Sequence, residues 1–86
     1  MKFKNFEKKE YEIQYVCIPA KEEAQGLCYP PDVGLIMVDK NLKQRRRLNV
    51  LIEEVFHAHF FDLPEWKARK FAANLGKAIY SQFLQK

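Results

Sequence analysis

The order of apolar and polar residues divides the chain into a strand-rich first half and a helical second half. Residues 10–18 alternate, with Tyr11 and Ile13 on one face and Glu12 between them, which is the period of a half-buried strand. Residues 35–38 are continuously apolar, as in a strand at the centre of a sheet. Later in the chain the apolar residues recur every three or four positions, which predicts amphipathic helices.

The first predicted helix covers residues 41–61. Asn41 followed by Gln44 resembles a capping box, so we expect the helix to begin near Leu42. At about 100° per residue, one broad apolar face is formed by Leu48, Leu51, Ile52, Val55, Phe56 and His59.

The second predicted helix covers residues 63–84. Asp62 is expected to cap its start, with Glu65 three residues on and Pro64 in the first turn, where a missing N–H group costs nothing. Its apolar stripe is expected to consist of Ala68, Ala72, Leu75, Ile79 and Phe83. Small side chains at Ala72 and Gly76 leave room for close packing on the first helix.

The order of these elements predicts an α+β fold. Strands come first, helices follow, and the loops are too short for βαβ crossovers, which favours a small antiparallel sheet of two to four strands followed by two long packed helices. Residues 1–86 are expected to form a single domain, in which residues 10–38 supply the sheet. Residues 1–9 would be an edge strand or a loose arm. Within the sheet region, residues 20–26 form a polar connection that could contain a helical turn.

Composition limits where the chain can act. Of its 86 residues 48% are hydrophobic, yet no run approaches the roughly 20 apolar residues that span a bilayer, and the charged start does not resemble a secretory signal. We expect no membrane association. Cys17 and Cys28 lack a framework spacing, which favours reduced thiols in a cytoplasm. A buried structural role is expected for Cys28, which could also approach the face of the helix that carries His57.

Basic residues gather at the beginning of the first predicted helix. Cations at a helix N-terminus oppose the helix dipole, so this placement suggests a partner for them, although a solvated basic face is the more ordinary interpretation. Nucleic-acid phosphate or an acidic protein would be suitable partners. The residues are Lys40, Lys43, Arg45, Arg46 and Arg47, in a chain of net charge +4.

The centre of the first helix holds the residues best suited to chemistry. Glu53 and His57 are one helical turn apart, and Glu54 lies three residues before His57. A carboxylate and an imidazole at this spacing can act on one bound atom. The same spacing also produces an ordinary surface pair worth about 0.2–0.5 kcal/mol, so both interpretations stay open.

The segment from Val50 to Ala58 resembles the active-site helix of small zincin-type metallopeptidase-like proteins of phages and prophages, which carry the motif HExxH. The Gly-x-Cys-Tyr-Pro-Pro sequence of residues 26–31 and the Leu-Pro-Glu of residues 63–65 are also similar to that family. The resemblance implies that His57 corresponds to the second histidine ligand and Glu54 to the general base. Glu53 stands where the first histidine ligand is expected.

The resemblance implies a phage-type protein, in the host cytoplasm, with a degenerate metallopeptidase-like site. Glu54 would be a vestigial base. Either no cofactor or one divalent metal, zinc before others, is expected, with Glu53 and His57 as ligands and Glu65 or Asp62 as the nearest third ligand. The expected function is binding of an unidentified protein partner rather than proteolysis. A metal-dependent peptidase, a nucleic-acid or acidic-partner binder and a virion assembly component are the alternatives.

Overall fold

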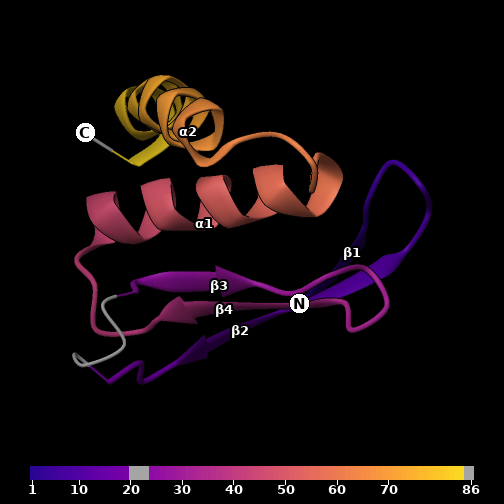
Figure 1. Ribbon diagram of the computed structural model, residues 1–86. Helices are drawn as coiled ribbons and strands as arrows, with labels where there is room; N and C mark the ends of the chain where they lie inside the picture. Colours follow the sequence, from indigo (N-terminus) through magenta and orange to yellow (C-terminus); the bar gives the residue numbers. More distant parts are fainter. Residues whose placement is uncertain (20–23, 85–86) are drawn as a thin grey trace.

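The computed structural model describes residues 1–19 and 24–84, which form a sheet, a helix on one face of it and a second helix on the first (Figure 1). The fold is therefore α+β, as predicted. Its elements are β1 (Lys2–Lys4), β2 (Glu10–Val16), β3 (Gly26–Cys28), β4 (Leu35–Asp39), α1 (Gln44–His59), α2 (Glu65–Ile79) and a π-helical turn η2 (Tyr80–Leu84). Among these described elements, no helix has the length and apolar character needed to cross a membrane. Residues 20–23 of the polar connection lie outside the description.

The described sheet has the strand order β1-β2-β4-β3 and is mixed rather than antiparallel. β1 pairs antiparallel with β2, and β3 with β4, but β2 and β4 are parallel, with Ile13 opposite Ile36. The prediction of a purely antiparallel sheet is therefore wrong at the central pair. β3 runs back along the outside of the sheet, so the chain can enter β4 in the direction of β2 without a crossover helix. The central position predicted for residues 35–38 is confirmed.

Residues 1–9 form an edge strand and a turn instead of a loose arm. Asn5, which is only 6% exposed, ties this segment to the end of α1. Its side-chain N–H donates to the Ala58 carbonyl over 3.0 Å, and its side-chain oxygen accepts the backbone N–H groups of Glu7 and Lys9 at 3.0 and 2.9 Å. Asn5 thus satisfies one of the carbonyls that the end of a helix leaves unpaired.

The hydrophobic core lies between the sheet and α1. Alternate residues of β2, as expected, face this layer, but Tyr15 at the far end of the strand is 48% exposed. Burial raises the pKa of Tyr11 to about 12, and its hydroxyl donates to the Tyr29 carbonyl over 2.8 Å. The buried cluster consists of Tyr11, Ile13, Ile36, Val38, Val50 and Ala58.

Neither helix begins with the cap that the sequence suggests. The N-cap of α1 is Lys43, without a side-chain hydrogen bond, because Asn41 belongs to the turn after β4, where its N–H bonds the Asp39 carboxylate over 3.0 Å. The N-cap of α2 is Pro64 rather than Asp62, again without a side-chain bond. Proline disfavours helical geometry in the residue before it, so α2 begins only after Pro64.

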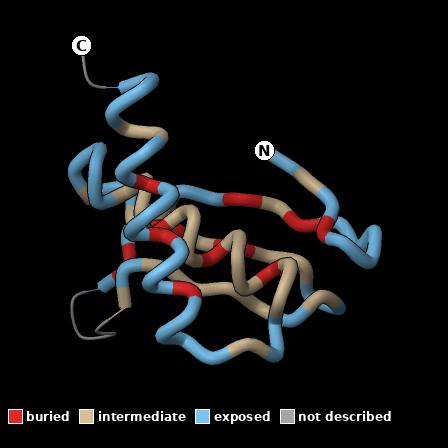
Figure 2. Tube along the Cα trace, turned by 90° about the horizontal axis from the view of Figure 1, so that it is seen from above, coloured by how far each residue is buried: buried red, intermediate tan, exposed pale blue. Residues whose placement is uncertain are grey.

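The contact between α1 and α2 is made by small residues. Ala68, Ala72 and Gly76 are the buried residues of α2, and a Cβ atom at Gly76 would lie 1.9 Å from the side-chain oxygen of Asn49. The predicted close packing at Ala72 and Gly76 is confirmed. The wider apolar stripe is not confirmed, because α2 packs on α1 through its small residues and most of its remaining surface is exposed (Figure 2). Leu75 of α2 is 38% exposed, and Phe83, which lies in η2, is 74% exposed.

Candidate functional site

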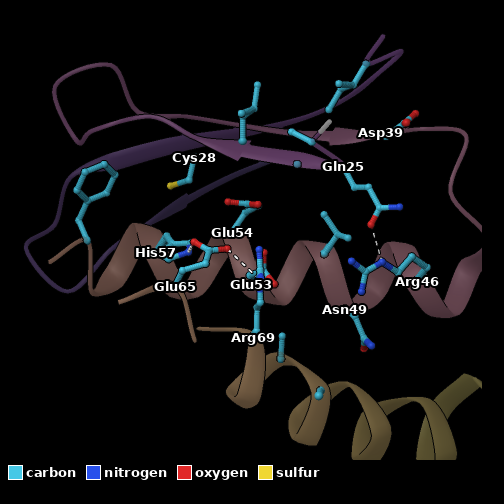
Figure 3. Close-up of a pocket in the computed structure, with 18 of the residues that line it drawn as sticks. Gln25, Cys28, Asp39, Arg46, Asn49, Glu53, Glu54, His57, Glu65 and Arg69 are labelled. Carbon is cyan, nitrogen blue, oxygen red and sulfur yellow. Dashed lines mark hydrogen bonds and ion pairs between the residues drawn. The ribbon is translucent and has the colours of Figure 1, made fainter. Parts of the chain in front are cut away.

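A cavity of about 1000 Å³ lies between β3, α1 and α2 (Figure 3). We call it the β3 groove. Its described polar lining consists of Gln25, Cys28, Asp39, Arg46, Asn49, Glu53, Glu54, His57, Glu65 and Arg69. Apolar side chains also line it, among them Ile18, Leu27, Val50, Leu63 and Ala72. A cavity of this size in which several polar groups converge beside apolar walls is a candidate binding site.

The residues predicted for chemistry on α1 all line this groove. Glu54 is buried and points toward β3, whereas Glu53 and His57 are half-buried on the side of α1 that faces the start of α2 (Figure 3). A surface pair of Glu53 and His57 was one of the two interpretations that the sequence left open. α2 covers this side of α1, so Glu53, Glu54 and His57 face one cavity from neighbouring positions.

His57 bonds Glu65 of α2 instead of Glu53 of its own helix. The distance between His57 Nε2 and Glu65 Oε2 is 2.8 Å. Glu65 also lies 3.5 Å from the Nε atom of Arg69, one turn later in α2. Burial raises the pKa of Glu53, and a hydrogen bond to Glu65 and the negative charge of that residue raise it further. Glu65 is therefore the residue that joins the two helices across the groove.

Glu54 is the most buried carboxylate of the groove, at 6% exposure. Burial raises its pKa to about 7, and the negative charges of Glu53 and Glu65 add to the effect. Among the described residues it has neither a hydrogen-bond partner nor an ion pair. Cys28 faces it from β3, and burial together with the Glu54 charge raises the pKa of this thiol to about 12. Cys28 is thus near the site, as the sequence allowed, and is kept protonated.

The close approach of β3 to α1 depends on Gly26. A Cβ atom at this position would lie 2.6 Å from a Val50 methyl carbon and 2.9 Å from a Glu54 carboxylate oxygen. Glycine in a strand often marks such an approach. The absence of a side chain at Gly26 lets the strand lie directly above the buried carboxylate.

β3 is the edge of the sheet next to the groove. The residues on either side of β3, Gln25 and Tyr29, form backbone hydrogen bonds with the β4 side. The Tyr29 N–H donates to the Leu35 carbonyl and the Asp39 N–H donates to the Gln25 carbonyl, both over 2.9 Å. Backbone groups of an antiparallel strand alternate in direction, so those of Gly26 and Cys28 point away from β4. No backbone bond from a described residue reaches this outer edge.

The described residues, as they are arranged in this structure, do not form a metal-binding site. No group of three or more histidine, cysteine, aspartate or glutamate side chains among residues 1–19 and 24–84 could hold one. The His57 nitrogen already bonds Glu65, and Glu54 points toward β3. Of the two candidates for a third ligand, Glu65 lines the groove whereas Asp62 lies outside its lining. The ligand set stays a prediction, and we derive no chemical step through a metal.

The basic residues before and within α1 have separate contacts. Arg46 lines the groove, and its Nε atom donates to the Gln25 side-chain oxygen over 2.6 Å. The other two arginines lie over aromatic rings, Arg45 over Tyr80 at 5.1 Å and Arg47 over Tyr15 at 5.9 Å. Lys40 and Lys43 are exposed. Their predicted role in binding nucleic acid or an acidic partner stays a prediction.

Several groove residues were not predicted from sequence. Gln25 lies just before β3, Asn49 lies in α1 and Arg69 lies in α2, so these residues meet only through the fold. Only Gly26 offers a local signal, since a glycine at the start of a short strand suggests a close backbone approach.

Comparisons with protein-family models, with curated proteins and with solved structures return no match. The resemblance to phage metallopeptidase-like proteins therefore rests only on the residues that suggested it.

Proposed function

We propose that this chain is a binding protein that holds an extended segment of a partner protein along β3, inside the β3 groove. The carrying observation is that the outward backbone groups of Gly26 and Cys28 lie beside a cavity of about 1000 Å³. An exposed strand edge pairs readily with another chain. A pocket next to such an edge adds selection of side chains.

Strand addition would use both parts of the site. The partner segment bonds the N–H and C=O groups of Gly26 and Cys28, which supplies affinity independent of its sequence. Side chains alternate along an extended chain, so every second residue of the partner faces α1 and enters the groove. The carboxylates and His57 there select among these side chains.

The proposal is consistent with the resemblance to phage and prophage metallopeptidase-like proteins. In this interpretation Glu54 is a vestigial base, Glu53 replaces a ligand histidine, and His57 bonds Glu65. The scaffold would then serve for binding without proteolysis. We also propose a reducing, cytoplasmic setting, which is supported by the unpaired thiols of Cys17 and Cys28.

The first test fills the groove. Ala73 of α2 is exposed and lines the cavity, whereas Ala78 of the same helix is exposed and lies outside its lining. Peptides are selected on the wild-type protein from a displayed library of short random sequences. We expect Ala73→Trp to weaken their binding at least about tenfold by steric exclusion, which is about 1.4 kcal/mol, and Ala78→Trp to leave it unchanged. Circular dichroism checks that both variants fold.

The second readout tests strand addition itself. Amide hydrogen exchange of Gly26 and Cys28 should slow when a selected peptide is bound, because their N–H groups become donors to it. The amide of Leu27, which points toward β4, provides the internal control. Selected peptides that bind the Ala73→Trp variant normally and leave these two amides unprotected contradict the proposal.

A further inference from the structure

The β3 groove is negative in a chain that is positive. Its described lining contains four carboxylates, of Asp39, Glu53, Glu54 and Glu65, against the guanidinium groups of Arg46 and Arg69. The whole chain carries a net charge of +4. At pH 8, above the pKa of about 7 that burial gives Glu54, the cavity therefore attracts cations, although the net charge of the whole chain is positive.

Glu54 is the carboxylate that lacks a partner. It is 94% buried and lines the groove, and among the described residues no donor or cation contacts it. Glu65, in contrast, contacts both His57 and Arg69. The Glu54 oxygens open into the groove, since the buried side-chain oxygen that lacks a partner among the described residues is Oδ1 of Asn49. A donor that arrives with the ligand can therefore reach the Glu54 carboxylate and bond it.

The walls of the groove suit a particular kind of cation. Apolar side chains of Leu27, Val50 and Leu63 line the same cavity as the carboxylates. Lysine and arginine combine a long apolar stem with a charged end, and they bury the stem along apolar surface. A metal ion needs several converging ligands, and the described residues offer no such group.

We propose that the β3 groove recognises a lysine or arginine side chain of the partner segment, whose stem packs on the apolar walls and whose charged end bonds Glu54 and Glu53. This inference rests on the proposed function, because the basic residue is delivered by a segment paired with β3. Beyond strand addition, the inference names the chemical class of the partner side chain that the groove selects. Glu54 and Glu53 are then the residues that determine specificity.

The ligand side of the test uses the peptides selected on the wild-type protein. We expect them to share a lysine or an arginine at one position. Replacing that residue by norleucine, which keeps an apolar stem and removes the charge, should weaken binding at least about tenfold at pH 8, because it removes one member of a buried charged pair. Exchanging lysine for arginine at the same position shows which of the two ends the groove prefers.

The protein side of the test removes the acceptor. Glu54→Gln keeps the size of the side chain and should weaken binding of the basic peptide at least about tenfold. It should leave binding of the norleucine peptide unchanged, so that the two losses are not additive. Glu7→Gln removes an exposed carboxylate in the turn after β1 and should not change either affinity.

The outcomes separate this inference from the function on which it rests. Selected peptides that Ala73→Trp excludes, but that carry no shared basic residue or bind Glu54→Gln normally, overturn the inference and leave strand addition intact. A library that yields no peptide excluded by Ala73→Trp overturns the proposed function and the inference together. Circular dichroism and the unfolding midpoint of Glu54→Gln identify a variant that fails to fold, in which case Glu53→Gln is measured in its place.

Discussion

Asn5 and Glu54 are the two buried polar side chains among the described residues, and each is 6% exposed. Asn5 takes part in three hydrogen bonds that join the N-terminal turn to the end of α1. Glu54 takes part in none with a described residue, and it faces the groove. Because proteins satisfy nearly all of their buried polar groups, equal burial has opposite meanings here. Asn5 has a structural role, whereas Glu54 is available to a ligand.

The comparison also separates two kinds of cost. A neutral amide whose nitrogen and oxygen are both hydrogen-bonded adds to stability, whereas a buried carboxylate resists ionisation. Substitution at the two positions should therefore change stability in opposite directions.

The largest effect is expected at Asn5. Asn5→Ala leaves the Ala58 carbonyl and two backbone N–H groups without their partner, which should lower the free energy of unfolding by about 3–4 kcal/mol. Urea unfolding followed by circular dichroism measures the change. Asn74→Ala, at an exposed position of α2, is the matched control and should stay within about 0.5 kcal/mol. A similar small change for Asn5→Ala would remove the contrast between the two buried residues.

The next effect is expected at Glu54 and depends on pH. Its pKa is about 7 in the folded protein and 4.5 in the reference state, so the folded state binds the extra proton between these values. Stability from this residue is therefore present below about pH 4.5 and is lost as pH rises to about 7. Glu54→Gln should be more stable than wild type by about 2–3 kcal/mol at pH 8, since each pKa unit corresponds to about 1.4 kcal/mol. At pH 4.5 the difference should nearly disappear.

Unfolding curves of wild type and Glu54→Gln across this pH range provide the measurement. Using the difference between the two proteins removes the contribution of other titrating groups that they share. A difference that stays constant with pH would show that Glu54 is not the titrating residue.

The smallest of the three effects is expected at Gly26. Gly26→Ala places a methyl group against Val50 and Glu54, and overpacking of this kind costs about 1–2 kcal/mol. The Glu54 side chain can move aside more easily than buried Val50. A double-mutant cycle with Val50→Ala should show that the smaller residue relieves part of the cost. Fully additive losses would place the strain elsewhere.

Much of the fold could be predicted because it is encoded locally. The alternation at Tyr11 and Ile13, the apolar run of β4 and the small residues Ala72 and Gly76 each indicate their own environment. The parallel pairing of β2 with β4 could not be predicted, since it depends on β3 passing to the outside of the sheet. The start of α2 was misplaced because Asp62 is a residue type that often caps helices. The position of Pro64 decides the actual start, since a proline disfavours helical geometry in the residue before it.

The sequence predicted only the part of the candidate site that lies on α1. Glu53, Glu54 and His57 lie within two turns of α1, so their proximity follows from helix geometry. The partner of His57 does not, because Glu65 lies on another helix and an i,i+4 rule favours Glu53. The opposite wall of the groove is formed by β3, and its position next to α1 could be known only from the tertiary fold.

The strand order has a consequence for how the chain assembles. Each outer strand forms a hairpin with an inner one, β1 with β2 and β3 with β4, so the sheet consists of two hairpins joined along β2 and β4. Local hairpins form quickly, whereas pairing distant segments is slower. Until β4 arrives, β2 keeps an unpaired edge that could join another copy. During synthesis β4 and then α1 follow, so the contact that closes the sheet is soon followed by the helix that covers it.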